Sequence, residues 1–284
     1  MAVSNSATNY FLKCKDHTVS GNKYELRYDQ EKDMLITFPR PELHELPEFY
    51  KSEKYISHTD SRRSLFEKTY QWVKTYMIDK KITWIEKEKK SRGRLLDIGA
   101  GTGDFLFRAK KKGWEVKGVE PNLQARNLAD KKGINLIEDS SSLASGSFDV
   151  ITMWHVLEHV PDLNEQIVEL KRLLKKDGLL VIAVPNFKSY DARKYKSFWA
   201  AYDVPRHLWH FSKNAILNIF SEHSFNLTQT KGLQFDSFYV SLLSEKYKND
   251  SGFSVNGIWT GFLSNLKAAR TGEYSSLAYF LTKE

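Results

Sequence analysis

The stretch RLLDIGAGTGDFL, Arg94–Leu106, places three glycines within five positions, between two apolar runs. The run before Gly99 is typical of a short buried strand, and DFLFRAKKKG after Gly103 has the spacing of a helix. A glycine turn that joins a strand to a helix brings backbone amides and the positive end of the helix to one point. We therefore expect a ligand to lie close to the backbone here.

Strands and helices alternate on the C-terminal side of this stretch. WEVKGVEP, INLIED and SFDVITMW are predicted strands, and LNEQIVELKRLLKKDG is a predicted helix that stops at Gly178. The continuous apolar run Leu179–Val184 indicates a central parallel strand that is covered on both faces. NLTQTKGLQF and SLAYFLTK are two further predicted strands. This alternation predicts a doubly wound α/β sheet with right-handed crossovers.

The regions around the sheet differ in character. In residues 1–60, KYELRYDQEKDMLITFP predicts a hairpin, and residues 61–92 form a predicted helical segment. The main domain is expected over 93–284. Within it, the aromatic and histidine-rich residues 186–211 are expected to form a functional loop, and 236–270 a helical insertion.

Composition restricts the cellular compartments in which the chain is expected. No run of about eighteen apolar residues exists, which argues against a membrane span. The first residues contain no apolar core of a secretory signal, and the lone Cys14 cannot form an internal disulfide. Together these features predict a cytoplasmic protein.

The net charge of +8 comes from 43 basic and 35 acidic residues. A basic balance can indicate attraction to nucleic acid or to an anionic membrane. The lysines cluster, however, in DKKITWIEKEKKSRGR and RAKKKGWE, where helical periodicity places them on solvated faces. Without an RNA-binding signature, this pattern argues against a nucleic-acid partner.

Acidic residues lie where the ends of the first three sheet strands are expected. Asp97 precedes the glycine turn, Glu120 ends the second strand, and Asp139 ends the third. An acidic side chain at the position of Glu120 can accept both hydroxyls of a ribose. Dinucleotide dehydrogenases share this spacing, but here Asp104 stands in place of their third glycine and would repel a pyrophosphate.

Four successive motifs carry a family resemblance. LLDIGAGTGDFL, VKGVEPN, SFDVITMWHVLEHVPD and GLLVIAVPN resemble those of class I S-adenosylmethionine-dependent methyltransferases, in particular ubiquinone-biosynthesis-type O-methyltransferases. The resemblance covers residues 90–235. It implies a Rossmann-like seven-stranded sheet whose last strand is antiparallel. It also implies S-adenosyl-L-methionine as cofactor, with S-adenosyl-L-homocysteine as product.

The resemblance assigns residues to each part of the cofactor. The amino-acid end would lie against Asp97 and the turn. The turn residues in question are Gly99, Ala100, Gly101 and Gly103. A cationic sulfonium suits carboxylates and an aromatic wall better than a phosphate does.

The nucleoside end of the cofactor is assigned in the same way. Glu120 would bind the ribose hydroxyls, while Pro121 and Asn122 would line the adenine. Asp139 would meet the exocyclic amine of the adenine, with Ser140 adjacent.

Two further parts of the chain complete the implied site. Trp154 and His155 would flank the methionine portion of the cofactor. The N-terminal region would cover the cofactor, and Tyr55 and His58 are its candidate contacts. Some relatives carry a zinc-binding N-terminal segment, but with Cys14 as the single cysteine this chain is not expected to use one.

Methyl transfer to a hydroxyl requires a base, and histidine titrates near neutrality. His207, in DVPRHLWH, is the first candidate, and His155 is the second. Glu158 and His159 are expected to cap and orient the following helix. An alternative remains: His155, Glu158 and His159 occupy the places of a Glu-x-x-Glu-His metal motif whose first ligand is changed. The prediction is that no metal is used.

The predicted function is methyl transfer to a small-molecule or glycan-type acceptor, at oxygen. Trp199, Tyr202 and Trp209 could form a wall for a ring or sugar face, or they could belong to the core. Two other functions remain open: methylation of RNA, and a non-catalytic regulatory protein that binds S-adenosylmethionine. The oligomeric state and the acceptor are not readable from the sequence.

Overall fold

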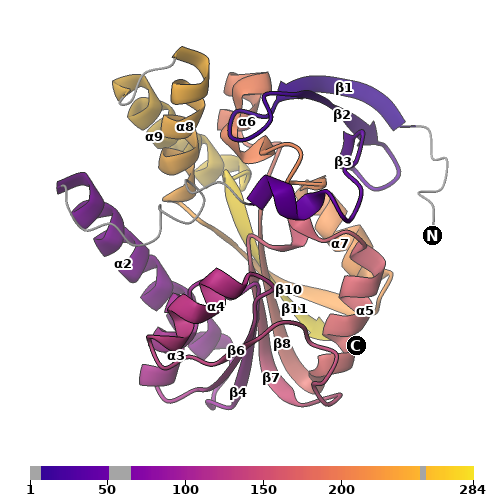
Figure 1. Cartoon of the computed structure of the whole chain (residues 1–284), viewed down its shortest axis with the longest axis vertical. Helices are drawn as coiled ribbons and strands as arrows, with labels where there is room; N and C mark the ends of the chain where they lie inside the picture. Colours follow the sequence, from indigo (N-terminus) through magenta and orange to yellow (C-terminus); the bar gives the residue numbers. More distant parts are fainter. Residues whose placement is uncertain (1–7, 51–64, 250–253) are drawn as a thin grey trace. The chain divides into compact units, whose positions relative to one another are not determined.

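The computed structural model describes residues 8–50, 65–249 and 254–284 (Figure 1). The chain divides into two compact units, each made of several segments. The first unit comprises Met1–Ser52, Leu157–Leu163 and Ala183–Tyr279. The second unit comprises Glu53–Val156, Asn164–Ile182 and Phe280–Glu284. Among the described residues, none of the helices combines the length and apolar character needed to cross a bilayer.

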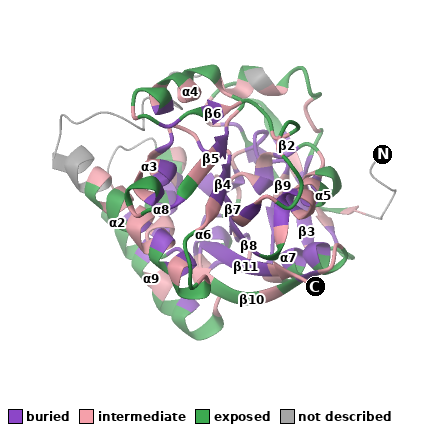
Figure 2. Ribbon diagram, turned by 90° about the horizontal axis from the view of Figure 1, so that it is seen from below, coloured by how far each residue is buried: buried purple, intermediate pink, exposed green. Residues whose placement is uncertain are grey.

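A mixed sheet of seven strands confirms the predicted fold class. Its strand order is β10-β11-β8-β7-β4-β5-β6. The strands are β4 (Arg94–Ile98), β5 (Glu115–Val119), β6 (Leu136–Ile137), β7 (Phe148–Trp154), β8 (Leu174–Pro185), β10 (Phe225–Gly232) and β11 (Ser276–Lys283). β4 pairs in parallel with both β5 and β7. The apolar strands β4, β7 and β8 are largely buried, as expected for the centre of such a sheet (Figure 2).

The helices associated with the second unit are α2 (Leu65–Glu88), α3 (Asp104–Lys111), α4 (Leu123–Asp130) and α5 (Leu163–Leu173). α3 follows the glycine turn directly and buries Phe105, Leu106 and Ala109. α2 lies within the predicted helical segment 61–92. These helices follow from the apolar spacing of the sequence.

The boundary between α5 and β8 differs from the prediction. The helix was expected to continue to Gly178, but it ends at Leu173 and β8 begins with the next residue. Leu174 is fully buried, and the Lys175 ammonium donates to Asp149 on β7 over 2.8 Å. These tertiary contacts extend the strand through LKKDG, a segment whose local composition favours a helix end.

A second sheet belongs to the first unit and has the order β1-β2-β3-β9. Its strands are β1 (Thr8–Lys15), β2 (Lys23–Asp29), β3 (Met34–Phe38) and β9 (Trp209–Phe211). The β2–β3 hairpin was predicted, whereas β1 and β9 were not. β9 pairs with β3 across more than 170 residues of sequence, as in Met34 opposite Phe211.

Residues 186–211, predicted as a loop, are in fact largely folded and buried. They contain α6 (Tyr190–Tyr195), the 3-10 turns η3 (Lys196–Phe198) and η4 (Ala200–Tyr202), and β9. Trp199 and Tyr202 are 2% and 3% exposed and pack with Cys14 and Leu26 in one hydrophobic cluster. These two rings therefore belong to the core of the first unit.

The remaining helical elements are η1 (Leu46–Tyr50), η2 (Leu157–His159), α7 (Lys213–Ser221), α8 (Asp236–Asn249) and α9 (Val255–Thr271). Ser212 caps α7, as its sequence position predicts, because its Oγ accepts a hydrogen bond from the Ala215 amide over 3.0 Å. α8 and all of α9 except Thr271 fall within the predicted helical insertion, 236–270.

Candidate active site

The glycine turn between β4 and α3 has the backbone conformation that its sequence requires. Gly99, Gly101 and Gly103 all have positive φ, at 70°, 53° and 74°, a region that side chains with a Cβ disfavour. A Cβ at Gly99 would lie 2.4 Å from Val156, whereas one at Gly101 would meet no atom within 4 Å. The turn is thus closely packed at its start and open at its middle, so a ligand can approach the backbone at Gly101.

The acidic residue at the end of β5 lies against this turn. One Glu120 oxygen accepts from the Gly101 amide over 2.8 Å, and the other accepts from the Asn122 amide over 2.9 Å. Asn122 also caps α4, since its Oδ1 accepts from the Ala125 amide. Pro121, between them, is exposed. The structure therefore brings together the glycine turn and Glu120, as an adenosyl site requires.

Asp97 is a buried carboxylate beneath the turn. The β4–β7 register places it opposite Thr152, whose Oγ1 donates to it over 2.6 Å. Burial raises the pKa of Asp97 to about 7, although the hydrogen bond from Thr152 and the attraction of Lys81 act in the opposite direction. A carboxylate held in this state gains stability when a positively charged group arrives beside it.

The Trp154 ring already lies against a positive charge. The Lys81 ammonium, on α2, lies 4.1 Å from the centre of the Trp154 ring. Within the described part of the chain, the Trp154 Nε1–H is buried without a hydrogen-bond partner. The next residue, His155, has a φ of 58°, an uncommon conformation that is often found at functional sites.

The third acidic position is at the surface. Asp139 is exposed, and its carboxylate accepts from the amide and hydroxyl of Ser141, which lower its pKa. The Ser140 hydroxyl donates to Glu169 on α5 over 2.6 Å. The assignment of Asp139 and Ser140 to the adenine stays a prediction.

Asp104, which distinguishes this turn from a dinucleotide fingerprint, is held by two lysines. Its oxygens accept from Lys74 and Lys132, each over 2.6 Å. Although burial raises the pKa of Asp104, these hydrogen bonds outweigh it and lower the pKa. The carboxylate is therefore kept charged at the start of α3, where the helix dipole favours an anion.

Tyr55 and His58 lie outside the described residues. Their contact with the cofactor, and the role of residues 1–60 as a cover, stay predictions.

These features of the second unit fit S-adenosylmethionine. The turn is open at Gly101, Asp97 is a buried carboxylate close to it in the chain, and the Trp154 ring already lies under a cation. Sequence reasoning missed Thr152 and Lys81. Thr152 could have been identified from the sequence, because it is a polar residue in the middle of an apolar strand. Nothing in the sequence of α2 distinguishes Lys81 from its neighbouring lysines.

The first unit holds a cluster of histidines around His207, the candidate base. His207 is 8% exposed, and its Nδ1–H donates to the Ala201 carbonyl over 2.9 Å. This hydrogen bond leaves Nε2 as the proton-accepting nitrogen. Nε2 lies 3.8 Å from an Asp203 oxygen, so a negative charge is placed to stabilise the imidazolium.

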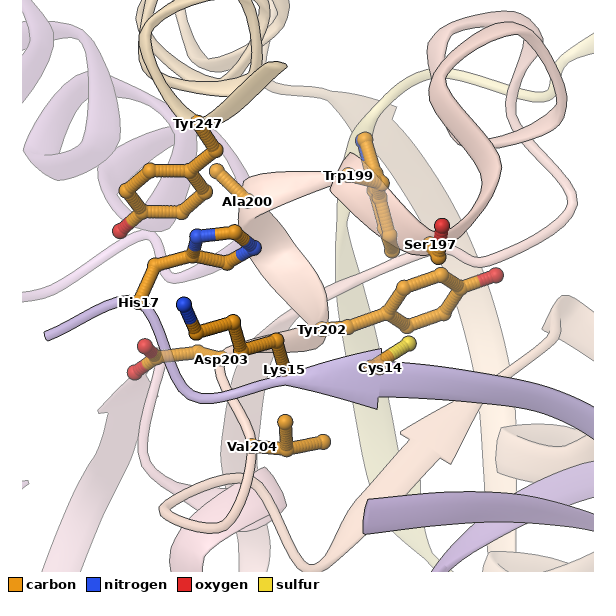
Figure 3. Close-up of a pocket in the computed structure, with 10 residues that line it drawn as sticks. All are labelled: Cys14, Lys15, His17, Ser197, Trp199, Ala200, Tyr202, Asp203, Val204 and Tyr247. Atoms are coloured by element: carbon orange, nitrogen blue, oxygen red, sulfur yellow. The ribbon is translucent and has the colours of Figure 1, made fainter. Parts of the chain in front are cut away.

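Asp203 is held in position by Arg206. The Arg206 guanidinium donates through Nε over 2.9 Å and also through a second nitrogen. Although burial raises the pKa of Asp203, the hydrogen bonds from Arg206 lower it below its usual value. Asp203 also borders a small pocket lined by Cys14, Trp199 and Tyr202 (Figure 3).

His159 lies edge-on to His207, with ring centres 4.5 Å apart. Its Nδ1 is 2.9 Å from the Tyr50 hydroxyl and 3.1 Å from the Arg206 carbonyl. Burial, and secondarily the charge of His207, lowers the pKa of His159 to about 4. His159 is therefore neutral at pH 7.

The first unit brings together three side chains of metal-ligating types. The ligand atoms of Glu158, His159 and His207 all lie within 4.8 Å of one another. Two members come from the motif that the sequence singled out, and His207 is a third that sequence reasoning had considered only as a base. Three ligands of these types could suit zinc.

The other residues of segment 186–211 have structural roles. His210 is buried, and its Nε2 lies 3.0 Å from the Thr37 hydroxyl. The Trp209 indole donates to the Val160 carbonyl over 2.7 Å, and the Arg40 guanidinium lies over its ring. These contacts attach β9 to β3 and to the residues that follow η2.

Comparison with known proteins identifies the family of the chain. A family profile described as a methyltransferase domain matches residues 70–230. A ubiquinone biosynthesis O-methyltransferase from Pelagibacter ubique is 30% identical, over 61% of this chain and 75% of that protein. One of the same name from Actinobacillus pleuropneumoniae is 33% identical, over 33% of this chain and 46% of that protein. The chain thus spans about half the length of some curated relatives that it matches.

Solved structures share the fold at low sequence identity. Magnesium protoporphyrin IX methyltransferase from Synechocystis, with bound S-adenosylhomocysteine, has a TM-score of 0.55 and 13% identity, covering 83% of this chain and 97% of that chain. Phosphoethanolamine N-methyltransferase 2 from Haemonchus contortus, with S-adenosylhomocysteine, also has a TM-score of 0.55, at 15% identity, covering 93% of this chain and 70% of that chain.

Proposed function

Because the chain belongs to the S-adenosylmethionine-dependent methyltransferases, we propose that it methylates an oxygen of a small-molecule acceptor. Relatives named as O-methyltransferases support the choice of oxygen. The single observation that carries the proposal is the arrangement of His207, whose Nδ1–H is bonded to a carbonyl and whose Nε2 lies near Asp203.

We propose that the cofactor is held by the residues around the glycine turn. When bound, S-adenosylmethionine supplies a methyl group on a good leaving group. Asp97 would bind its ammonium, and the amides of the turn would contact its amino-acid end. Glu120 would accept hydrogen bonds from the ribose hydroxyls. One of these would replace the hydrogen bond that Glu120 now accepts from the Gly101 amide. Trp154 and His155 would border the methionine portion.

His207 is proposed as the general base. Its Nε2 accepts the proton of the acceptor hydroxyl, so that the oxygen lone pair becomes available for the new bond to carbon. The imidazolium that forms keeps its hydrogen bond to Ala201, and the Asp203 carboxylate stabilises its charge. Arg206 acts through Asp203 as a positioning residue.

A methyl-transfer assay with S-adenosylmethionine labelled on the methyl group tests this proposal. Phenols, hydroxylated quinols and sugar alcohols serve as acceptors, and mass spectrometry locates the added methyl. In His207→Asn the side-chain amide can still donate to Ala201, so the fold should be kept while kcat falls by about 10²–10⁴. His44→Asn, at an exposed histidine, is the matched control.

The outcomes separate the competing functions. Full activity in His207→Asn would refute the role of this residue, while S-adenosylhomocysteine binding measured by calorimetry would report the cofactor site independently. Methylation confined to RNA, with affinity that falls steeply as salt rises, would favour a nucleic-acid acceptor. Tight cofactor binding without transfer to any acceptor class would favour a regulatory protein.

A further inference from the structure

α9 exposes its large apolar side chains instead of burying them. Val255, Trp259, Phe262 and Leu266 are 73%, 57%, 48% and 51% exposed. They recur every three or four residues and so form one stripe along about 17 Å of the helix. Ile258, beside this apolar stripe, is 41% exposed. A contiguous apolar surface of this kind is typical of an interaction site.

The opposite face of α9 consists of small residues and fixes this orientation. Its buried positions are Gly257, Thr260, Gly261, Ser264 and Ala268. This face packs on α8 (Figure 1), where the two backbones approach closely. A Cβ at Gly261 would lie only 2.8 Å from the Phe238 Cα. Turning α9 to bury the apolar stripe would force large side chains into a contact that admits only glycine.

The charges around the apolar stripe are basic. α9 contains Lys267 and Arg270 and no acidic residue. Both of these side chains are exposed, whereas Lys194 on the neighbouring α6 lies towards the opposite face of α9, because its ammonium donates to Thr260 over 2.6 Å. The acidic residue of α6, Asp191, is buried and bonded to neighbouring groups. The flank of the stripe therefore carries positive charge.

We propose that α9 docks the protein on an anionic lipid bilayer, with the apolar stripe inserted at the interface and the basic flank at the headgroups. Tryptophan and phenylalanine beside lysine and arginine are the combination that interfacial helices use. Each basic residue near an anionic surface adds to the attraction.

The charge pattern argues against a second copy of the chain as the occupant. In a symmetric dimer across the stripe, Lys267 and Arg270 of one copy would meet no acidic residue on α9 of the other. Like charges at such an interface are unfavourable. An anionic bilayer has the complementary charge.

Vesicle sedimentation with the full chain tests the proposal. Wild type should bind vesicles of equal phosphatidylcholine and phosphatidylglycerol, and bind pure phosphatidylcholine at least tenfold more weakly. Trp259→Ser combined with Phe262→Ser should reduce binding by roughly tenfold or more, since two exposed side chains lose their apolar burial. Lys267→Glu combined with Arg270→Glu should reduce binding to the anionic vesicles selectively.

Matched controls keep the test falsifiable. Leu123→Ser with Val168→Ser removes two equally exposed apolar residues from α4 and α5 and should leave vesicle binding unchanged. S-adenosylhomocysteine affinity should be the same in all variants, which checks that each is folded. Failure of wild type to bind anionic vesicles overturns the proposal, as does equal loss in the control. A dimer that dissociates in the Trp259 and Phe262 variant, without vesicle binding, would instead identify a contact between copies.

Discussion

Replacing the buried carboxylate of Asp97 separates its cost to folding from its value to cofactor binding. In Asp97→Asn, an amide oxygen can still accept from Thr152, but the charge is gone. Burial raises the pKa of Asp97 from 3.8 to about 7. Ionising it therefore costs about 4 kcal/mol more in the folded protein than in the unfolded chain, as an upper bound.

The sign of the pH dependence follows from proton binding. Between about pH 4 and pH 7 the folded protein holds a proton on Asp97 that the unfolded chain has released, so stability falls as pH rises through this range. Without cofactor, Asp97→Asn should be more stable than wild type at pH 8. This gain should be about 3 kcal/mol smaller at pH 5, where wild-type Asp97 is protonated when folded.

Urea unfolding at pH 5 and pH 8 measures this difference, and calorimetry measures binding of S-adenosylhomocysteine. Affinity should fall at least tenfold in Asp97→Asn, because a charged hydrogen bond to the ligand ammonium is lost. Thr152→Val is the control: it leaves the carboxylate buried without its hydrogen bond and should destabilise by about 1–3 kcal/mol. A variant less stable than wild type at pH 8, or a gain independent of pH, would refute the reasoning.

Four further substitutions test other parts of the structure. Gly101→Ala should weaken S-adenosylhomocysteine binding at least tenfold, since its Cβ enters open space where the ligand is expected, and its φ of 53° should cost about 1–2 kcal/mol of stability. Gly99→Ala should lower the melting temperature further, because its Cβ also meets Val156. Glu120→Gln should weaken the same binding by about tenfold in calorimetry, through a poorer acceptor for the ribose; unchanged affinity would exclude it from the site. Asp203→Asn should lower the free energy of unfolding in urea by about 3–5 kcal/mol, because buried Arg206 loses its partner; a loss near zero would contradict this.

Much of the second unit could be predicted because its signals are local. The strand, the glycine turn and the helix from Arg94 follow from adjacent residues, and parallel pairing places Glu120 beside the turn. The contact between Asp97 and Thr152 depends on the register of two strands 55 residues apart, which no local pattern specifies.

The first unit was harder to predict because its contacts join distant segments. β9 looks like part of a loop, and only its pairing with β3 makes it a strand. The aromatic residues Trp199 and Tyr202 suggested an acceptor wall, yet burial against Cys14 on β1 makes them core. The contacts of Asp203 with Arg206 and His207 could have been predicted from the sequence. Residues three and four positions apart lie on the same side of a helical turn.

The interleaving of the two units has a consequence for how the protein can change. Six segments alternate between the units, so the chain passes from one to the other five times. β8 begins in the second unit and ends in the first, and β11 runs the opposite way. A single recombination event therefore cannot exchange one unit and leave the other intact. Expressing either unit separately would require new linkers between its segments, joined in the order in which they already follow one another in the sequence.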